Sequence, residues 1–461
     1  MIATIAPIPK DSKKSLNDSS NYRGIALSST IGKLLDSIII MNNPDIFTSM
    51  NLQFAYKDKF STTQCTFVVN ETINYYLQNG SNVHAILLDA TKAFDRIHYI
   101  KLFQELRRRN LCPTLCRFLA LQYTMQRCRV KWGSCMSNDF SASNGVKQGG
   151  VLSPILFTLY MDCLLERLKG ANVGCHIGNT FAGAFAYADD IILLATTRTS
   201  MKRLIHICEC FSHEYSISLN AKKRNHLFFS NDVNSNPLPF EMQGSPIPIV
   251  PRDKHIGNWI GNNVFETVVE DNVNTLYRNT NLLMSQFPKA EPHVKYRLFK
   301  SYCMSVYGSQ LWDYSSKKCD RFYVCWRKCI RRLFDIPSNT HCRYLHLICN
   351  DVPVDLQLHV RFINFMKSSI RSKCDIVRIC ANLAFNCSRS YASNSWFHIC
   401  NKWDIDKTNL DINVDQLKSI CAERENVGDQ ICAGLIHDLI CLRQNTDDVS
   451  LTELIDELCV S

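Results

Sequence analysis

The sequence predicts an α+β fold over residues 1–261, followed by a region built from helices. Residues 185–194 place two adjacent acids, Asp189 and Asp190, between apolar runs, which is the pattern of two strands joined by a tight turn with both acids at its tip. Residues 83–89 form a short apolar run that ends in an acid and leads into a helix. Beyond residue 265, helical patterns near 265–286, 295–312 and 318–335 indicate a small bundle.

The composition is that of a globular protein with an excess of positive charge. Of 461 residues, 46% are hydrophobic and 20% are charged, which excludes a disordered chain. The formal net charge of +10 suits a polyanionic partner. The chain opens without a secretory signal, and its apolar runs stay short of the ~18 residues of a membrane span. We therefore expect an intracellular protein of the nucleus and cytoplasm, without membrane contact, whose 23 cysteines are mostly reduced.

The N-terminal segment predicts a hairpin and a helix. Residues 5–10 indicate an edge strand, because Pro7 and Pro9 exclude a central position, and residues 22–27 indicate its partner. This pair would present Lys10 and Arg23, although the ordinary place of a single Lys or Arg is a solvated surface. Farther along the chain, a helix is predicted from about residues 61–64 to about residue 79, and Gly80 closes it.

Three acids are candidates for chemistry. Asp89 stands at the carboxyl end of a buried strand, where it could serve as a metal ligand or a base, or could merely cap the next helix. Asp189 and Asp190 are costly to bury without compensation. A divalent cation would neutralise them, and oxygen ligands suit Mg²⁺ or Mn²⁺. The alternative is an ordinary turn that carries two acids.

A glycine-rich loop precedes a long helix that runs to about residue 169. Gly149 and Gly150 would allow close backbone approach to a base or a sugar. Ser153 is predicted as the N-cap of the helix, with Pro154 at its first position. Upstream of this loop, residues 127–131 alternate Arg and Lys along a strand, and such a face usually meets water or a polyanion.

The C-terminal half contains a basic stripe and scattered metal-ligating residue types. Arg327 with Arg331, and Lys328 with Arg332, lie one helical turn apart beside Trp326, so both a solvated face and a nucleic-acid contact remain open. A separate group of cysteines and histidines fits no zinc-finger spacing, and we predict no metal ligand there: Cys329, His341, Cys342, His346 and Cys349.

Five stretches, taken in order, resemble reverse transcriptases, and among them the polymerase of non-LTR (LINE-type, jockey-like) retrotransposons. They are Pro-Ile-Pro-Lys with Tyr-Arg-Gly-Ile (7–10, 22–25), Leu-Asp-Ala-Thr-Lys-Ala-Phe-Asp (88–95), Gly-Val-Lys-Gln-Gly-Gly-Val-Leu-Ser-Pro (145–154), Tyr-Ala-Asp-Asp (187–190) and Leu-Asn-Ala-Lys-Lys (219–223). The resemblance implies a right-hand polymerase. Fingers and a palm, with an antiparallel palm sheet flanked by helices, would cover 1–261, a helical thumb-like domain 262–340, and a helical region of unknown role 341–461.

The resemblance also implies roles for individual residues. Asp89, Asp189 and Asp190 would be the catalytic acids and would bind two Mg²⁺ ions, with Mn²⁺ as an alternative. The substrate-binding residues would be Phe94 as the steric gate against ribonucleotides, Gln148 and Gly149 in the dNTP pocket, and Lys10 and Arg23 on the triphosphate.

Two further assignments complete the implied site. Ile256 and Gly257 match the turn that grips the primer end. Lys223 matches a lysine that donates a proton to pyrophosphate. The family usually has Thr or Ser where this chain has Arg224, which leaves Lys222 as an alternative and favours Lys223.

The implied function is that of an RNA-directed DNA polymerase that adds dNTPs to a DNA 3′ end on an RNA template. Its partners would be template RNA, a DNA primer and dNTPs, without a protein partner. The chain starts at the first fingers strand, so we expect the polymerase portion of a larger element. The alternatives are a truncated, silent relic that binds RNA, and a group II intron maturase or an RNA-templated RNA polymerase. Phe94 at the gate disfavours RNA synthesis.

Overall fold

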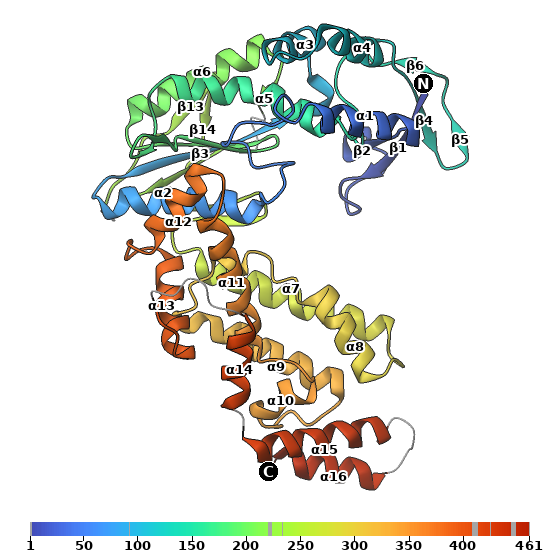
Figure 1. Ribbon diagram of the computed structural model, residues 1–461, viewed down its shortest axis with the longest axis vertical. Coiled ribbons are helices and arrows are strands. Elements are labelled where there is room, and N and C mark those ends of the chain that lie inside the picture. The colour runs from blue at the N-terminus through green and yellow to red at the C-terminus, as the bar shows by residue number, and fades with distance from the viewer. Residues whose placement is uncertain are drawn as a thin grey trace. The chain divides into compact units, whose positions relative to one another are not determined.

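The chain divides into two compact units, Met1–Gly257 and Asn258–Ser461. The computed structural model, shown in Figure 1, describes residues 2–91, 93–219, 224–232, 234–407, 414–424, 426–443 and 449–460. The first unit combines mainly antiparallel sheets with helices and the second is mainly helical, which confirms the predicted α+β class. Among the described residues, no helix combines the length and the apolar composition needed to cross a bilayer.

The first sheet has the strand order β2-β1-β4-β5, with β6 also paired to β4. Its strands are β1 (Ile2–Pro9), β2 (Tyr22–Leu27), β4 (Arg127–Trp132), β5 (Cys135–Met136) and β6 (Phe140–Ser141). The prediction of an edge strand holds only in part, because Ile2 to Ile5 pair in parallel with β4 and are internal, whereas the residues after Ile5 pair with β2 alone. Pro7 and Pro9 lie beyond that stretch and face only β2, so their missing N–H groups cost the sheet no bond to β4.

The second sheet carries the predicted acids. Its order is β11-β3-β10-β9, with β12 also paired to β3. The strands are β3 (Val83–Thr91), β9 (Ala184–Tyr187), β10 (Asp190–Ala195), β11 (Ser218–Leu219) and β12 (Asn225–Phe229). All of its pairings are antiparallel. Residues 83–88 and 191–195 are almost completely buried, because helices cover both faces of the sheet.

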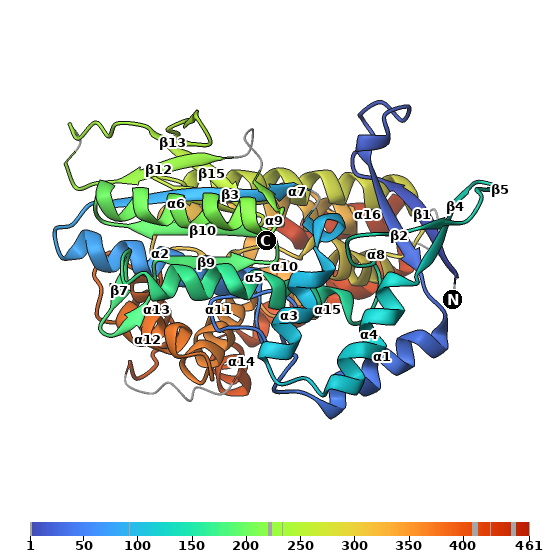
Figure 2. The same cartoon turned by 90° about the horizontal axis from the view of Figure 1, so that it is seen from above.

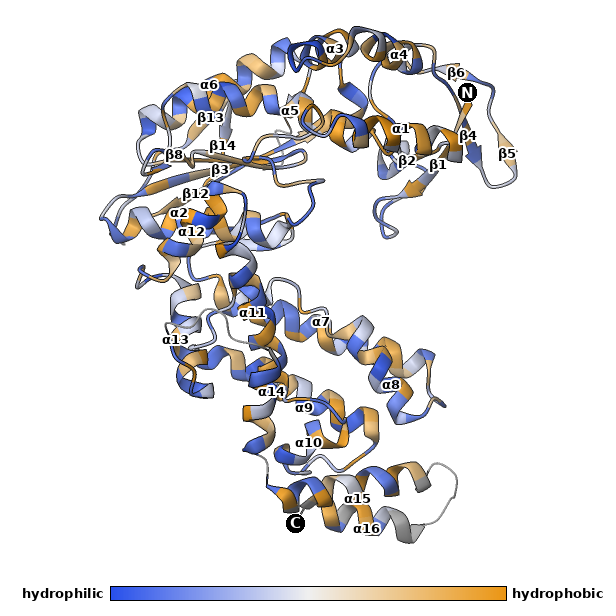
Figure 3. Ribbon diagram, in the orientation of Figure 1, coloured by the Kyte–Doolittle hydropathy of each residue, from blue (hydrophilic) through white to orange (hydrophobic). Residues whose placement is uncertain are grey.

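Helices α2 (Thr62–Gln78) and α6 (Arg198–Glu214) lie on opposite faces of this sheet (Figure 1). Figure 2 shows α6 running along β10 and β3, and Figure 3 colours the elements of this unit by their hydropathy. A third helix, α5 (Ser153–Gly170), also packs on β9. The predicted N-cap at Ser153 is wrong. Leu152 occupies that position, and the Ser153 hydroxyl lies 3.5 Å from the Tyr123 hydroxyl instead.

The remaining elements of the first unit surround the two sheets. The helices are α1 (Thr30–Asn42), α3 (Tyr99–Arg108) and α4 (Pro113–Thr124). Short strands form the pairs β7 (His176–Ile177) with β8 (Thr180–Phe181) and β13 (Phe240–Met242) with β14 (Ser245–Ile247). Strands β15 (Arg252–His255) and β16 (Asn258–Gly261) flank the boundary between the two units.

The second unit is a helical bundle with a break that the sequence pattern did not predict. Its helices are α7 (Phe265–Gln286), α8 (Pro292–Leu298), α9 (Asp320–Phe334), α10 (Cys342–Ile348), α11 (Val354–Ile370), α12 (Asp375–Ala384), α13 (Tyr391–Trp403), α14 (Val414–Glu423), α15 (Val427–Arg443) and α16 (Val449–Val460). The single helix predicted near 295–312 is wrong. After α8 a wider π-turn spans Phe299–Cys303, and positive φ angles at Val306 and Gly308 end the helical path.

The structure assigns part of the basic stripe to packing within the unit. Trp326 is 3% exposed and belongs to the core, so it does not support a nucleic-acid contact. Arg331 donates to the Thr340 carbonyl at 2.6 Å and so ties the end of α9 to the loop before α10. Arg332 donates to Asn281 Oδ1 on α7 at 2.8 Å. These two cations therefore stabilise the bundle.

A buried histidine pair lies beside the strand that carries Asp89. His84 Nδ1 on β3 and His226 Nε2 on β12 are 3.0 Å apart. Burial lowers the pKa of each to about 4, and the nearby Arg198 adds to the effect. The pKa of histidine in the unfolded chain is about 6.5. The unfolded state therefore binds more protons between pH 6.5 and 4, and stability falls as the pH drops through that window.

We predict that lowering the pH from 7 to 5.5 costs the first unit about 1 kcal/mol per histidine of this pair. His226→Asn should remove one of the two contributions, whereas the control His213→Gln, on the exposed side of α6, should retain both. Native-state hydrogen exchange of the β3 amides measures the free energy of opening. If the free energy of opening fell equally with pH in wild type and in His226→Asn, the prediction would be contradicted.

Candidate active site

The three predicted acids meet at one edge of the second sheet. Asp89 on β3 and Asp190 on β10 are direct cross-strand partners, so their side chains leave the same face. Asp189 lies in the turn that precedes β10, and its carbonyl accepts from the Ala90 N–H at 3.3 Å. All three acids are half-buried. The tip of the hairpin differs from the prediction. It consists of Ala188 and Asp189, because Asp190 already pairs with Tyr187.

The turn that carries Asp189 is strained and is held by a buried glutamine. Ala188 has φ = 56°, a left-handed conformation that costs a residue with a Cβ atom. Gln53 is fully buried, and its side-chain Oε1 accepts from the Ala188 N–H at 2.8 Å. Its Nε2 donates to the Ala188 carbonyl at 3.3 Å. Both backbone polar groups of Ala188 are therefore satisfied by one amide.

Main-chain bonds fix the segment that supplies this glutamine. Phe54 N–H donates to the Ala186 carbonyl at 2.8 Å, and Ala186 N–H donates to the Leu52 carbonyl at 2.9 Å. Just upstream, Met50 N–H donates to Asp162 Oδ2 of α5 at 2.9 Å. Asp162 also binds Arg109 at 2.8 Å, and burial raises the pKa of its carboxyl to about 6. The segment 50–54 thus extends the sheet beyond β9.

Sequence reasoning assigned no role to Gln53. The available signal was a polar residue between Leu52 and Phe54, ahead of a helix. This pattern indicates a buried amide, but it could not identify a partner 135 residues away. The side chain is a positioning residue for the turn.

The negative charges of the acids influence the pKa of neighbouring side chains. Tyr56, three residues after Gln53, has its phenol pKa raised by burial and by the charge of Asp189. Cys65, in the first turn of α2, has its thiol pKa raised by burial and by Asp190. The negative charges therefore reach both the loop after Gln53 and α2, and a cation at this edge would be favoured.

The glycine-rich loop lies against the turn that follows β3. Val146 N–H donates to the Phe94 carbonyl at 2.8 Å, and Gly145 N–H donates to the Ile97 carbonyl at 3.0 Å. Gly145 has φ = 84°, and a Cβ atom there would lie 2.8 Å from the Asp95 Cα. The close approach of the two segments therefore requires a glycine.

Three predicted substrate-binding residues lie in this arrangement. The Phe94 ring stacks on Phe157 of α5 with 4.5 Å between centroids. Gln148 Nε2 is 3.4 Å from Asp95 Oδ1, and the Gln148 carbonyl accepts from a β2 N–H at 2.6 Å. Gly149 has φ = 104°, and a Cβ atom there would lie 3.0 Å from a β2 carbonyl oxygen. The loop therefore joins the turn after β3 to strand β2.

The two predicted fingers cations lie on the hairpin of β1 and β2. Arg23 is exposed on β2, opposite Ile8. Lys10 follows β1, is exposed, and donates from Nζ to the Ser20 carbonyl at 2.9 Å. Arg23 is two residues from the Ile25 side chain that Gly149 approaches. Strand β2 thus connects Arg23 with the glycine-rich loop, whereas Lys10 closes its own hairpin loop.

The last predicted residues lie near the end of the first unit. Ile256 and Gly257 have φ = 44° and 86°, the two positive angles of a type I′ turn. A β-branched residue in this region is strained. Lys223 lies outside the described residues, as does Lys222. The neighbouring Arg224 is buried and donates to the Met242 carbonyl at 2.9 Å, which explains a long cation at this position.

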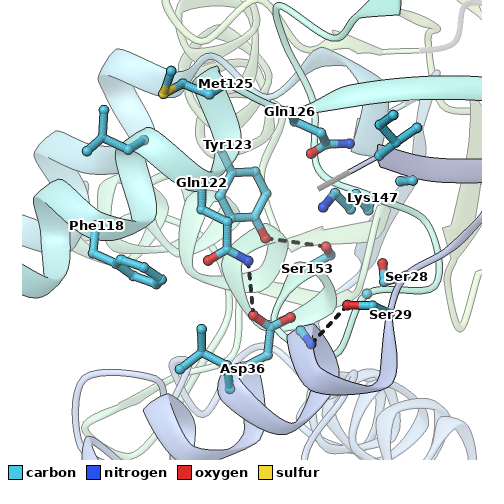
Figure 4. Close-up of a pocket in the computed structure, with 16 residues that line it drawn as sticks. Ser28, Ser29, Asp36, Phe118, Gln122, Tyr123, Met125, Gln126, Lys147 and Ser153 are labelled. Carbon is cyan, nitrogen blue, oxygen red and sulfur yellow. Dashed lines mark hydrogen bonds between the residues drawn. The ribbon is translucent and has the colours of Figure 1, made fainter. Parts of the chain in front are cut away.

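A cavity of about 370 Å³ borders the glycine-rich loop, and Figure 4 shows its lining. Residues from β1, α1 and α4 line it together with Lys147, Gly150 and Ser153. Burial raises the pKa of the Asp36 carboxyl on one wall, and Gln122 Nε2 lies 3.4 Å from its Oδ1. In the chain, Gln148 and Gly149 therefore lie between Lys147 and Gly150, which both line this cavity.

We predict that Gln53→Leu destabilises the turn by about 1–3 kcal/mol, because it leaves the buried N–H of Ala188 without its acceptor. The matched control is Gln64→Leu. Gln64 is also buried, but its Oε1 has no hydrogen-bond partner in the described structure, so its loss should cost little. Amide exchange of residues 186–190 reports the effect. Equal protection in both variants would remove Gln53 from this role.

Comparisons with known proteins place this geometry in a family. The chain is 27% identical over 206 residues to the Retrovirus-related Pol polyprotein from type-2 retrotransposable element R2DM of Drosophila melanogaster, covering 44% of this chain and 19% of that protein. It is 24% identical over 246 residues to the RNA-directed DNA polymerase from mobile element jockey of Drosophila funebris, covering 51% and 26%. The chain thus spans about a quarter or less of the length of these curated relatives.

Among solved structures, apo telomerase from Candida tropicalis aligns with a TM-score of 0.42 and 12% identity, over 91% of this chain and 69% of that one. The family model for reverse transcriptase (RNA-dependent DNA polymerase) matches residues 8–263. The match includes the acids of the second sheet and the glycine-rich loop. Because it covers more than half of the 461 residues, this chain belongs to the reverse transcriptase family.

Proposed function

We propose that this chain is an RNA-directed DNA polymerase of a non-LTR retrotransposon, adding dNTPs to a DNA 3′ end on an RNA template. The observation that carries the proposal is the meeting of Asp89, Asp189 and Asp190 at one edge of the sheet. The similarity to the R2 and jockey polymerases supports the element class. Template RNA, a DNA primer and dNTPs are the proposed partners.

The carboxylates fit the metal ions that such chemistry uses. Reverse transcriptases generally use divalent metal ions. Three half-buried carboxylates supply hard oxygen ligands, which suit Mg²⁺ or Mn²⁺. Two such ions, when bound, would activate the primer 3′-hydroxyl and stabilise the charge of the leaving pyrophosphate. We propose Asp89, Asp189 and Asp190 as their ligands.

The chain's own residues would orient the reactants around these acids. Asp89 and Asp190 are fixed by the strand pairing, and Asp189 by the hydrogen bonds of Gln53 to Ala188. Rigid placement of this kind removes the cost of reorganising the ligands during the reaction. Gln53 thus acts on the chemistry through the turn.

Nucleotide selection is proposed for the loop arrangement beside the acids. Phe94 would exclude ribonucleotides, since its ring is held by the stack on Phe157. Gln148 and Gly149 would line the dNTP pocket, and the cations of the β1–β2 hairpin would bind the triphosphate: Lys10 and Arg23.

The remaining assignments follow the family pattern. Ile256 and Gly257 would grip the primer end, and their positive φ angles give a sharp turn for that purpose. Lys223 is proposed as the proton donor to pyrophosphate. We also propose fingers and palm over 1–261, a thumb-like domain over 262–340 and a C-terminal helical region over 341–461.

The second candidate is a silent relic that binds RNA without polymerising. In a relic, nothing would require the three acids to be positioned together. In this structure Asp89 pairs with Asp190 across the strands, and the turn that carries Asp189 is held by the buried side chain of Gln53. The placement of the three acids at one sheet edge therefore favours the polymerase.

We predict that Asp189→Asn lowers dNTP incorporation at least about 100-fold, because it removes a negative metal ligand while keeping the side chain's size. Binding of the RNA template should stay within about twofold. The assay is Mg²⁺- or Mn²⁺-dependent extension of an oligo(dT) primer on poly(rA). The control is Asp232→Asn, in an exposed loop. Synthesis at the wild-type rate in Asp189→Asn would refute the metal assignment, and inactive wild type would favour the relic.

We predict that Phe94→Ala lowers the preference for dNTP over rNTP at least about tenfold, because the ring no longer occupies the space of a 2′-hydroxyl. Phe94→Tyr keeps the stack and the volume, so it should keep the preference. The ratio of kcat/KM for the two nucleotides measures this. An unchanged ratio in Phe94→Ala would exclude the gate.

A further inference from the structure

Three side chains of metal-ligating types lie together in the second unit. In the sequence, they are separate from every residue proposed to take part in polymerisation. His293 comes from α8, and His437 and Cys441 come from α15, where a spacing of four places them on one helical face. Their ligand atoms all lie within 4.8 Å of one another, and all three residues are half-buried. The first member is 148 residues from the last in the chain.

The distances are close to those of a metal-bound set. Cys441 Sγ lies 3.4 Å from His293 Nε2. The rings of His293 and His437 have centroids 4.4 Å apart and are inclined by 37°. In a tetrahedral zinc site, with bonds of about 2.0–2.3 Å, neighbouring ligand atoms are about 3.3–3.8 Å apart. Small side-chain rotations would therefore bring the His437 nitrogen to the same distance from the other two ligand atoms.

The hydrogen bond of His437 prepares this residue as a ligand. Its Nδ1 lies 3.2 Å from the Ile348 carbonyl of α10, so the proton belongs on Nδ1. The lone pair of Nε2 is then available for a metal. Histidines that bind zinc usually donate their other N–H to such an acceptor, which fixes the ring and its tautomer.

The charges around the cluster also suit a cation. Asp438 and Glu291 lie close enough to act electrostatically on Cys441, and these two carboxylates would attract a divalent ion. Arg297, near His293, opposes that attraction.

We propose that His293, His437 and Cys441 bind one zinc ion, with water at the fourth position. Two imidazoles and a thiolate select zinc over Mg²⁺ or Mn²⁺, which prefer oxygen ligands. On binding, the thiol proton is released to solvent as the sulfur–zinc bond forms. The ion would join α15 to α8, two helices that come from distant parts of the chain, and would stabilise the C-terminal region of the second unit.

Cobalt(II) substitution tests the site directly in the full chain after chelator treatment. Wild type should bind one Co²⁺ with a thiolate-to-cobalt charge-transfer band and strong visible absorption, and Zn²⁺ should displace it. Cys441→Ser should lose the charge-transfer band. The matched control Cys432→Ser should keep it, because Cys432 lies on the same helix and its thiol faces the Leu458 carbonyl at 3.7 Å. The readout is independent of polymerase activity.

Thermal melting supplies the second measurement. Zn²⁺ at about a hundredfold excess over Kd should raise the Tm of wild type and of Cys432→Ser by about 5–10 °C. His437→Gln, folded by circular dichroism, should show no such shift. The proposal is overturned if wild type lacks the cobalt band, if Cys441→Ser retains it, or if His437→Gln keeps the full zinc shift. Should a variant fail to fold, the wild-type cobalt spectrum alone decides.

Discussion

The candidate active site depends on one side chain, the buried amide of Gln53. The turn before β10 must bring Asp189 beside Asp89 and Asp190, and it does so with Ala188 in a left-handed conformation that costs on the order of 1–3 kcal/mol. Two hydrogen bonds from one rigid group offset that cost and leave no backbone polar group of Ala188 unsatisfied. The position of the acid therefore depends on the buried side chain of residue 53 and its two hydrogen bonds to Ala188.

The second constraint is backbone contact between segments that are distant in the chain. The turn after β3, the glycine-rich loop and β2 are joined by main-chain hydrogen bonds, and Gly145 permits an approach that any other residue would block. Side chains proposed for metal binding and for nucleotide selection thus belong to one connected framework. Such a framework tolerates changes in surface side chains more readily than changes in its glycines.

Local pattern was sufficient for much of this structure. The apolar runs around Asp89 and Asp190 predicted the central strands, because buried strands have a strong signature. The sequence did not reveal contacts between segments that are far apart in the chain. The parallel contact of β1 with β4 made the start of β1 internal, and the partner of Gln53 lies 135 residues away. The break after α8 and the burial of Trp326 were also missed, because both result from packing between helices. The roles of the site residues rest on resemblance and remain predictions.

Strand β3 is bonded along both edges, to β10 on one side and to β11 and β12 on the other, and its interior residues are almost completely excluded from solvent. Exposing it requires the cooperative opening of the whole sheet, whereas the short strands at the margin of the first sheet can fray individually. On mild heating, these marginal strands would then open before Asp89 and Asp190 separate. Such early opening would be reversible, because the central sheet remains as a framework on which the strands can pair again.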